Sequence, residues 1–156
     1  MICYHQTNLH IRILLQENNV SLGYIYLHKC SKNCWEDVSV VGIPGYGKVM
    51  YNIGLNFLKD DEFFIPYRNK QINVKCTYIY NKLIVNENVY SEKINKNDPE
   101  YVYMSNEYDN CFNRKYRLIK KENLDFIKGD YKFVFNEGIK LFSKLYEYKN
   151  EVITLT

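Results

Sequence analysis

Residues 38–58 combine a glycine-rich turn with the start of a helix, an arrangement that can bind an anion. They read VSVVGIPGYGKVMYNIGLNFL. The β-branched residues before the turn favour a buried strand, and Val49, Ile53 and Phe57 recur every four positions, as on one face of a helix. Glycines let a backbone approach a ligand, and the first amides of a helix carry partial positive charge. Residues 42–48 therefore predict a phosphate site, with a turn whose glycines serve geometry alone as the alternative.

The chain before this motif predicts antiparallel strands. Residues 10–16 and 22–28 are rich in apolar side chains and are joined by ENNVS, whose asparagines tolerate turn conformations. A polar connection and residues 35–37 then lead into the strand that begins at Val38. Three antiparallel strands are therefore expected before the first helix.

The chain after the motif predicts a strand that is reached by a helical crossover. The helix should end near Leu58, and residues 62–66 (EFFIP) read as a short strand closed by proline. Strands joined by a crossover are parallel as a rule, so this strand should lie beside the one at Val38. Their C-terminal ends should splay around the glycine turn, and a crevice at such a point is a common ligand site.

The remaining segments predict a helix, a loop, a strand and a helical end. Residues 71–84 should form an amphipathic helix, because Ile72, Cys76, Ile79 and Leu83 recur at spacings of three and four. Residues 91–110 are polar and predict a surface loop, with one strand considered at 101–103. Residues 114–120 read as a strand, and residues 123–148 as one or two helices interrupted near Gly129.

Composition indicates one globular domain over residues 1–156, with residues 121–156 as a helical closing segment. Of the 156 residues, 46% are apolar and 25% charged, and no apolar run approaches the length of a membrane span. The start lacks the pattern of a signal peptide, so a soluble, cytoplasmic protein is expected. The five cysteines are odd in number and irregularly spaced, which predicts free thiols.

The sequence also contains residues that could form a metal site or a nucleic-acid site, but neither site is favoured. His28, Cys30 and Cys34 could supply three zinc ligands, but a fourth is not in view, so no metal is expected. Residues 113–117 (NRKYR) could contact RNA, although a solvated edge strand is favoured. The lysines behind the net charge of +3 are scattered along the chain. The sixteen tyrosines could stack on bases, but the codon bias of an AT-rich genome would also supply them.

The order strand, strand, strand, glycine loop, helix, strand, helix resembles that of GNAT-type N-acetyltransferases, especially the small divergent members encoded by bacteriophages. Their phosphate loop reads Gln/Arg-x-x-Gly-x-Gly/Ala. Residues 42–47 (GIPGYG) keep both glycines but have Gly42 where the basic or amide side chain usually stands. Phage members often carry Gly-Tyr-Gly-Pro and a tyrosine one helical turn later, and residues 45–48 (GYGK) with Tyr51 are similar.

A second part of the resemblance lies in the later helix. The family often shows an asparagine, a small residue three positions on and a tyrosine four beyond that, and Asn73, Cys76 and Tyr80 stand at those spacings. Lys82 and Leu83 also resemble the Tyr-x-Lys-Leu-Gly-Phe ending, without its Gly-Phe. The resemblance implies an α/β (α+β) fold with a mixed, mostly antiparallel central sheet flanked by helices. A splayed strand pair in that sheet would form a crevice for coenzyme A.

The resemblance also implies a reaction, in which acetyl-CoA is the co-substrate and acetyl passes to an amine of a protein lysine, an N-terminus or a small molecule. Tyr80 matches the residue that protonates the leaving thiolate, with a core tyrosine as the alternative; Tyr78 should point to another face of the helix. Glu36 or Asp37 would accept the proton of the amine, directly or through a water, although both could be solvated surface acids.

The cofactor would lie along the strand and the turn. Its pyrophosphate would bind backbone amides, and its pantetheine arm would pair with the strand edge; these positions are Val40, Val41, Gly42, Gly45, Tyr46, Gly47 and Lys48. A phage-encoded protein would act in the host cytoplasm. The alternative is a catalytically weak or inactive GNAT-fold protein that binds a host or defence protein, and a third hypothesis is RNA binding.

Overall fold

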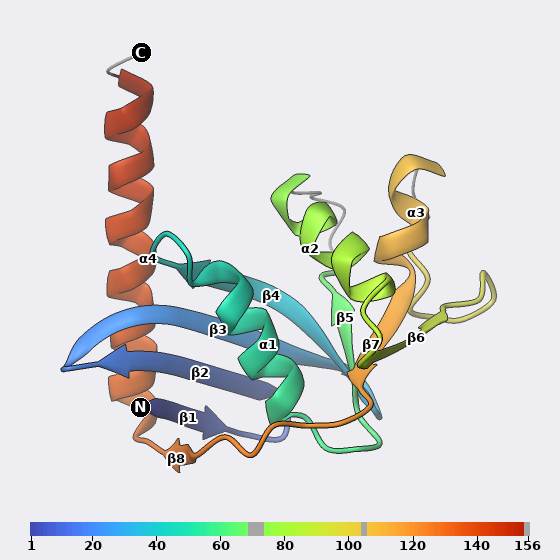
Figure 1. The fold of residues 1–156 in the computed structure, drawn as a ribbon, viewed down its shortest axis with the longest axis horizontal. Coiled ribbons are helices and arrows are strands. Elements are labelled where there is room, and N and C mark those ends of the chain that lie inside the picture. Colours follow the sequence, from blue (N-terminus) through green and yellow to red (C-terminus); the bar gives the residue numbers. More distant parts are fainter. Residues whose placement is uncertain (69–73, 104–105, 155–156) are drawn as a thin grey trace.

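The computed structural model describes residues 1–68, 74–103 and 106–154, with side chains except at 74–76, 106–108 and 146–154. Within these residues, an eight-stranded mixed sheet is the centre of the fold (Figure 1). The strands are β1 (Ile2–Gln6), β2 (His10–Glu17), β3 (Val20–Ser31), β4 (Cys34–Gly42), β5 (Phe63–Pro66), β6 (Val89–Lys93), β7 (Arg114–Leu118) and β8 (Phe126–Lys128). Their order across the sheet is β6-β7-β5-β4-β3-β2-β1-β8. The pairs β4–β5 and β1–β8 are parallel and the other neighbours are antiparallel, so the expected mixed, mostly antiparallel sheet is confirmed.

The predicted hairpin is formed by β2 and β3. Its turn places Asn18 and Asn19 at positive φ angles of 51° and 63°, a conformation that asparagine tolerates better than most residues. β4 follows as predicted, but β1 is an additional strand that pairs with β2 ahead of the hairpin. Four antiparallel strands, rather than three, therefore precede the first helix.

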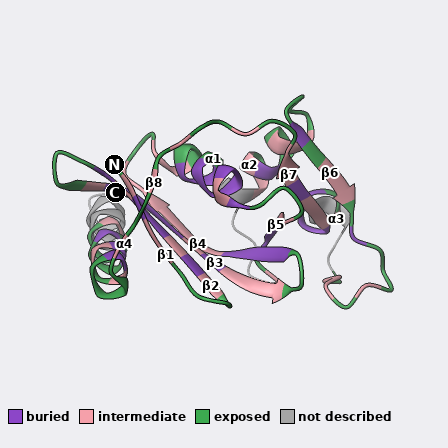
Figure 2. Ribbon diagram, turned by 90° about the horizontal axis from the view of Figure 1, so that it is seen from below, coloured by how far each residue is buried: buried purple, intermediate pink, exposed green. Residues whose placement is uncertain are grey.

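Four helices pack around this sheet: α1 (Gly47–Phe57), α2 (Val74–Ile84), α3 (Asn106–Phe112) and α4 (Tyr131–Thr154). Figure 2 shows α1 and α2 on one side of the sheet and α4 on the other. α3 packs against α2. The larger core lies between the sheet and α1, α2 and α3, and a smaller one lies under α4 around Leu14, Tyr24 and Val134.

The helix α1 follows the predicted span but buries a different set of residues than its i, i+4 pattern suggests. Ile53 is buried, whereas Val49 is exposed and Phe57 lies between these extremes. The buried face runs through Met50, Ile53 and Gly54, because Gly54 comes so close to Phe64 on β5 that a Cβ atom there would lie 3.3 Å from the ring. The helix therefore turns its glycine, not Val49, towards the sheet.

The crossover β4–α1–β5 brings two parallel strands side by side, as predicted. β5 pairs only with the first half of β4, where Cys34 faces Phe63 and Asp37 faces Pro66. The register between β3 and β4 shifts directly after Asp37, so that Val38 is an extra residue on β4. Such a bulge bends a strand and disrupts its pairing locally. Beyond it, the described residues pair β4 with β3 alone.

Two predictions about the second half of the chain are wrong. Residues 91–110 are not one loop, because β6 reaches Lys93 and α3 begins at Asn106, while residues 101–103 form no strand. Residues 123–148 begin with an irregular segment and β8, and only then continue as α4. β6 and β8 lie at the two edges of the sheet, and apart from the buried Val89 their side chains are partly or fully exposed, as in a loop. No helix in the described part of the chain is long and apolar enough to span a membrane.

Candidate functional site

Asp37 and Tyr80, two of the predicted catalytic residues, form a buried hydrogen-bonded pair. Asp37 is the last residue of β4 that pairs with β5, and Tyr80 comes from the middle of α2. The Tyr80 hydroxyl donates to Asp37 Oδ2 at 2.8 Å, and the two residues are 1% and 7% exposed. Tyr51 on α1 also hydrogen bonds to Asp37 through its side chain. The carboxyl group therefore lies where β4, α1 and α2 meet.

An aromatic shell surrounds this pair. The Tyr80 ring lies 5.8 Å from that of Tyr51, 5.8 Å from Phe112 and 5.4 Å from Tyr116, measured between ring centres. Burial in this shell raises the pKa of Asp37 to about 6, although the tyrosine hydrogen bonds act in the opposite direction. A carboxylate with a pKa near neutrality can both accept and return a proton under physiological conditions.

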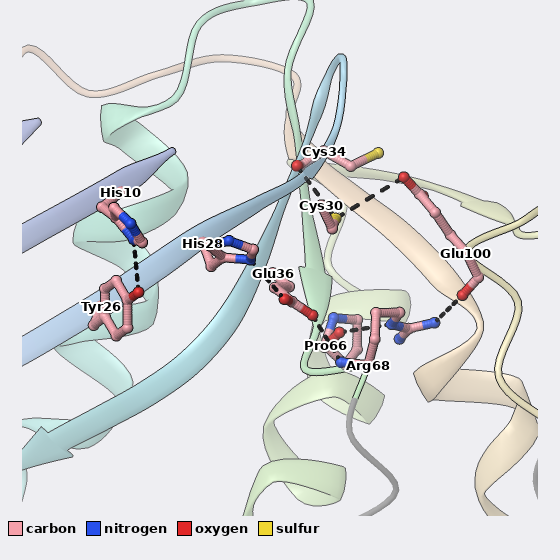
Figure 3. A network of polar contacts seen from close by, with 9 residues as sticks. All are labelled: His10, Tyr26, His28, Cys30, Cys34, Glu36, Pro66, Arg68 and Glu100. Atoms are coloured by element: carbon pink, nitrogen blue, oxygen red, sulfur yellow. Dashed lines mark hydrogen bonds and ion pairs between the residues drawn. The ribbon is translucent and has the colours of Figure 1, made fainter. Parts of the chain in front are cut away.

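Glu36, the other predicted base, has its carboxylate directed towards His28 and Arg68 (Figure 3). Its Oε1 lies 3.0 Å from Nδ1 of His28, and its Oε2 accepts a hydrogen bond of 3.0 Å from the backbone amide of Arg68. Neighbouring residues on a strand point to opposite faces. The structure therefore brings Asp37, but not Glu36, to Tyr80.

Arg68 is a residue of this region that the sequence did not single out. Its Nε donates to the carbonyl of Pro66 at 2.9 Å, and Nη1 donates to the Glu100 carbonyl and to Asn113 Oδ1, each at 3.2 Å. Nη2 donates to the carbonyl of Phe112, and burial lowers the pKa of the guanidinium. Arg68 thus ties the chain after β5 to the end of α3. A lone arginine after proline carries no sequence signal for such a role.

The glycine turn is built for a close approach between β4 and α1. A Cβ atom on Gly42 would lie 2.8 Å from the amide nitrogen of Gly47, so no side chain fits there without a shift of the backbone. Gly45 has a φ angle of 93°, which favours glycine. Residue 42 therefore has no room for a basic or amide side chain.

The helix begins at this turn without a side-chain cap. Tyr46 occupies the cap position and makes no capping hydrogen bond through its side chain. The first amides of a helix have no partner within the helix. Space beside Gly45 and Gly47 is open, since a Cβ atom on either would meet nothing within 4 Å. The predicted positions Gly45, Tyr46, Gly47 and Lys48 therefore form an accessible turn.

A groove of about 170 Å³ lies between α1 and α2. Its walls include Tyr51, Asn52 and Leu55 from α1 and Ile79 and Leu83 from α2, and further lining residues are Lys48, Lys82, Asn86, Val89 and Leu118. This volume is below the roughly 300 Å³ at which drug-sized ligand pockets begin, so it suits one part of a larger ligand. Tyr51 connects the two features, because it lines the groove and also hydrogen bonds to Asp37.

The other predicted positions are distributed as follows. Val40 packs towards the larger core and Val41 towards the smaller core under α4, so the two valines offer a ligand only the backbone edge of β4. Tyr78 is 54% exposed and points away from Tyr80, as expected. Asn73 and the side chain of Cys76 lie outside the described residues. No role was predicted from the sequence for Tyr51 or Lys82. Tyr51 is the tyrosine that follows the glycine turn, and Lys82 belongs to the Lys-Leu pair of the later helix.

The three residues that were considered as zinc ligands make other contacts. His28 contacts Glu36, and the Cys30 thiol donates to the carbonyl of Cys34 at 3.3 Å. Among the described residues, no group of three or more His, Cys, Asp and Glu side chains is arranged to hold a metal ion. None of the cysteines with described side chains, Cys3, Cys30, Cys34 and Cys111, forms a disulfide bond.

Comparisons of the chain with protein-family models, with curated proteins and with solved structures found no match.

Proposed function

We propose that this protein is an acetyl-CoA-dependent N-acetyltransferase that acetylates an amine of a protein lysine, an N-terminus or a small molecule. The observation that carries the proposal is the Asp37–Tyr80 pair at the point where β4 leaves β5. A proton acceptor and a proton donor are what amine acetylation needs, because the ammonium group must lose a proton and the thiolate must gain one. The strand order with one parallel pair around a helical crossover adds to the resemblance to GNAT enzymes.

The backbone of β4 and of the turn suits the cofactor. Past Val38, the edge of β4 away from β3 carries amide and carbonyl groups that can pair with the two amides of a pantetheine arm. Asp37 and Gly42 are five residues apart, which is about 16 Å at ~3.3 Å per residue. An extended pantetheine arm spans a similar length. The thioester would then lie near Asp37 and the pyrophosphate near the amides of residues 45–48.

The proton path uses the buried pair. At neutral pH most Asp37 carboxylates are ionised, since the pKa is about 6. When the amine attacks the thioester carbon, its proton passes to the Tyr80 oxygen while the Tyr80 hydroxyl proton moves to Asp37. When the carbon–sulfur bond breaks, the leaving thiolate takes a proton from Tyr80, which regains one from Asp37. The pair ends as it began, and the products are the amide and the free thiol.

Glu36 has a positioning role in this scheme. Its carboxylate bridges His28 on β3 and the amide of Arg68, so it links β4 to the chain that leaves β5. Removing Glu36 is expected to disturb the separation of β4 and β5 rather than the proton transfer itself.

Two measurements test the proposal. Isothermal titration should give a Kd for acetyl-CoA below about 1 mM, the upper end of common KM values. Intact-mass spectrometry with panels of peptides and small amines should then detect a gain of one acetyl group. Tyr80→Phe should keep acetyl-CoA binding and lower kcat about 100-fold. Failure of the wild-type protein to bind acetyl-CoA would overturn the proposal.

One observation favours the non-catalytic alternative, in which the fold binds a host or defence protein. Tyr80 is only 1% exposed and its hydroxyl is already engaged by Asp37, as in a structural core tyrosine. The two functions differ in the Tyr80→Phe variant. If acetyl-CoA binds and the variant acetylates a genuine acceptor at the wild-type rate, Tyr80 is structural.

A further inference from the structure

Two lysines from different helices converge at the rim of the groove between α1 and α2. Lys48 stands in the first turn of α1, and Lys82 in the last turn of α2. Both lie over the ring of Tyr78, with Lys82 Nζ 4.5 Å and Lys48 Nζ 5.3 Å from its centre. The groove thus has a local concentration of positive charge.

No carboxylate neutralises this charge in the described part of the chain. The ion pairs found there are His28–Glu36, Lys121–Asp60 and Lys140–Glu137. Like charges a few ångströms apart repel each other. Lys48 is also at the positive end of the α1 dipole, where acidic residues are favoured and α1 has none. Lys48 therefore places a positive charge where the helix dipole does not favour one.

We propose that Lys48 and Lys82 bind a phosphate group of a nucleotide ligand, with Tyr78 as the surface that holds both ammonium groups in place. The inference rests on the proposed function in taking that ligand to be acetyl-CoA. The phosphate is then either the pyrophosphate or the 3′-phosphate, which share the same charged oxygens. Because Gly42 has no room for a side chain, the positive charge comes from α2 instead. Lys82 is the residue that this assignment adds.

The alternative is an exposed pair of cation–π contacts that binds nothing. Such contacts are worth about 0.5–1 kcal/mol at exposed sites. That is enough to hold a lysine against Tyr78 without any ligand. The alternative predicts no effect of either lysine on anion binding.

Isothermal titration at low salt tests the assignment with two probes, acetyl-CoA and inorganic pyrophosphate. Lys48→Gln and Lys82→Gln should each raise the Kd about fivefold, and the double variant roughly 20-fold, since each removes one charge-assisted contact. Lys82→Arg should retain most of the affinity, and Lys96→Gln, in the exposed β6–α3 connection, is the matched control. Dephospho-CoA, which lacks the 3′-phosphate, distinguishes the two phosphate groups. If the lysines bind the pyrophosphate, dephospho-CoA should bind the wild type with the same affinity as CoA.

The outcomes separate this assignment from the proposed function. If the double variant binds acetyl-CoA as well as the wild type does, the lysine site is overturned and the acetyltransferase proposal stands. If the wild type does not bind acetyl-CoA, the acetyltransferase proposal is overturned, and the titration with pyrophosphate then tests the lysine site alone. Pyrophosphate binding to the wild type that is lost in the double variant supports the site. Equal binding to both proteins, or no binding to the wild type, overturns it.

Discussion

Replacing Asp37 by asparagine should change how the stability of the protein depends on pH. Asp37 is buried and accepts hydrogen bonds from Tyr80 and Tyr51. Asparagine has nearly the same shape, and its oxygen can accept one of these bonds while a rotated hydroxyl accepts from its amide. The variant therefore removes the charge with little change in packing.

The magnitude follows from the pKa. Burial raises the pKa of Asp37 from 3.8 to about 6, so the folded protein holds the proton more tightly than the unfolded chain does. Below pH ~4 the carboxyl is protonated in both states and costs nothing. As pH rises to ~6 and beyond, the carboxyl ionises more readily in the unfolded chain than in the folded protein. The free energy of unfolding of the wild type therefore falls by about 3 kcal/mol.

Asp37→Asn escapes this loss. The difference in free energy of unfolding, variant minus wild type, should rise by about 2.4 kcal/mol between pH 4 and pH 8. Urea unfolding at several pH values measures it, and the fluorescence of Trp35, the single tryptophan and a core residue that is 1% exposed, reports the transition.

A matched control removes a carboxylate from the surface. Asp61→Asn lies in the exposed turn before β5 and should leave the pH dependence of the wild type unchanged. If the difference between Asp37→Asn and wild type stays constant from pH 4 to pH 8, Asp37 does not titrate near neutrality and the proton path through it is wrong.

Three further predictions concern the turn, Arg68 and Tyr78. Gly42→Ala should destabilise the protein by about 1–3 kcal/mol, because its Cβ would meet Gly47, whereas Gly47→Ala should be neutral or stabilising by up to ~1 kcal/mol; chemical denaturation compares the two. Arg68→Lys should cost about 2–4 kcal/mol and lower Tm by roughly 5–10 °C, since lysine leaves buried acceptors without donors, and an unchanged Tm would contradict the described network. The lysines lower the pKa of Tyr78, so its phenol should ionise below the ordinary value of 10.0 in an ultraviolet titration, and Lys82→Gln should raise that midpoint. Equal midpoints would show that Lys82 does not act on the ring.

Local patterns were sufficient for the elements that lead to the site. The two asparagines define the β2–β3 turn, and the apolar runs beside them give the strands. The helical crossover dictates that β5 is parallel to β4. These features depend on neighbours in sequence and on general rules of chain connection, so the sequence alone could predict them.

The edge strands could not be predicted in this way. β6 reads VYSEK and β8 only FIK, and each becomes a strand because a distant segment supplies its hydrogen bonds: β7 for β6 and β1 for β8. Apart from the buried Val89, their side chains are partly or fully exposed, so no periodic apolar pattern marks them. Such pairings are non-local and leave little trace in a short window of sequence.

The sequence singles out the candidate residues but does not predict which of them contact each other. Glu36 and Asp37 are adjacent acids, and only the placement of Tyr80 and Tyr51 distinguishes the buried acceptor from the one that faces His28. The bulge at Val38, which ends the pairing of β4 with β5, has no local signature either. Arg68 acquires its partners from α3 and from the β6–α3 connection, far along the chain.

A crystal structure of the protein with coenzyme A would show directly where the cofactor binds. We expect electron density for the pantetheine arm along the free edge of β4 from Val38 to Gly42. The pyrophosphate should lie at the amides of residues 45–48, and the sulfur should lie within reach of the Tyr80 hydroxyl. Coenzyme A bound elsewhere, or a β4 edge that stays empty at saturating ligand, would contradict this expectation.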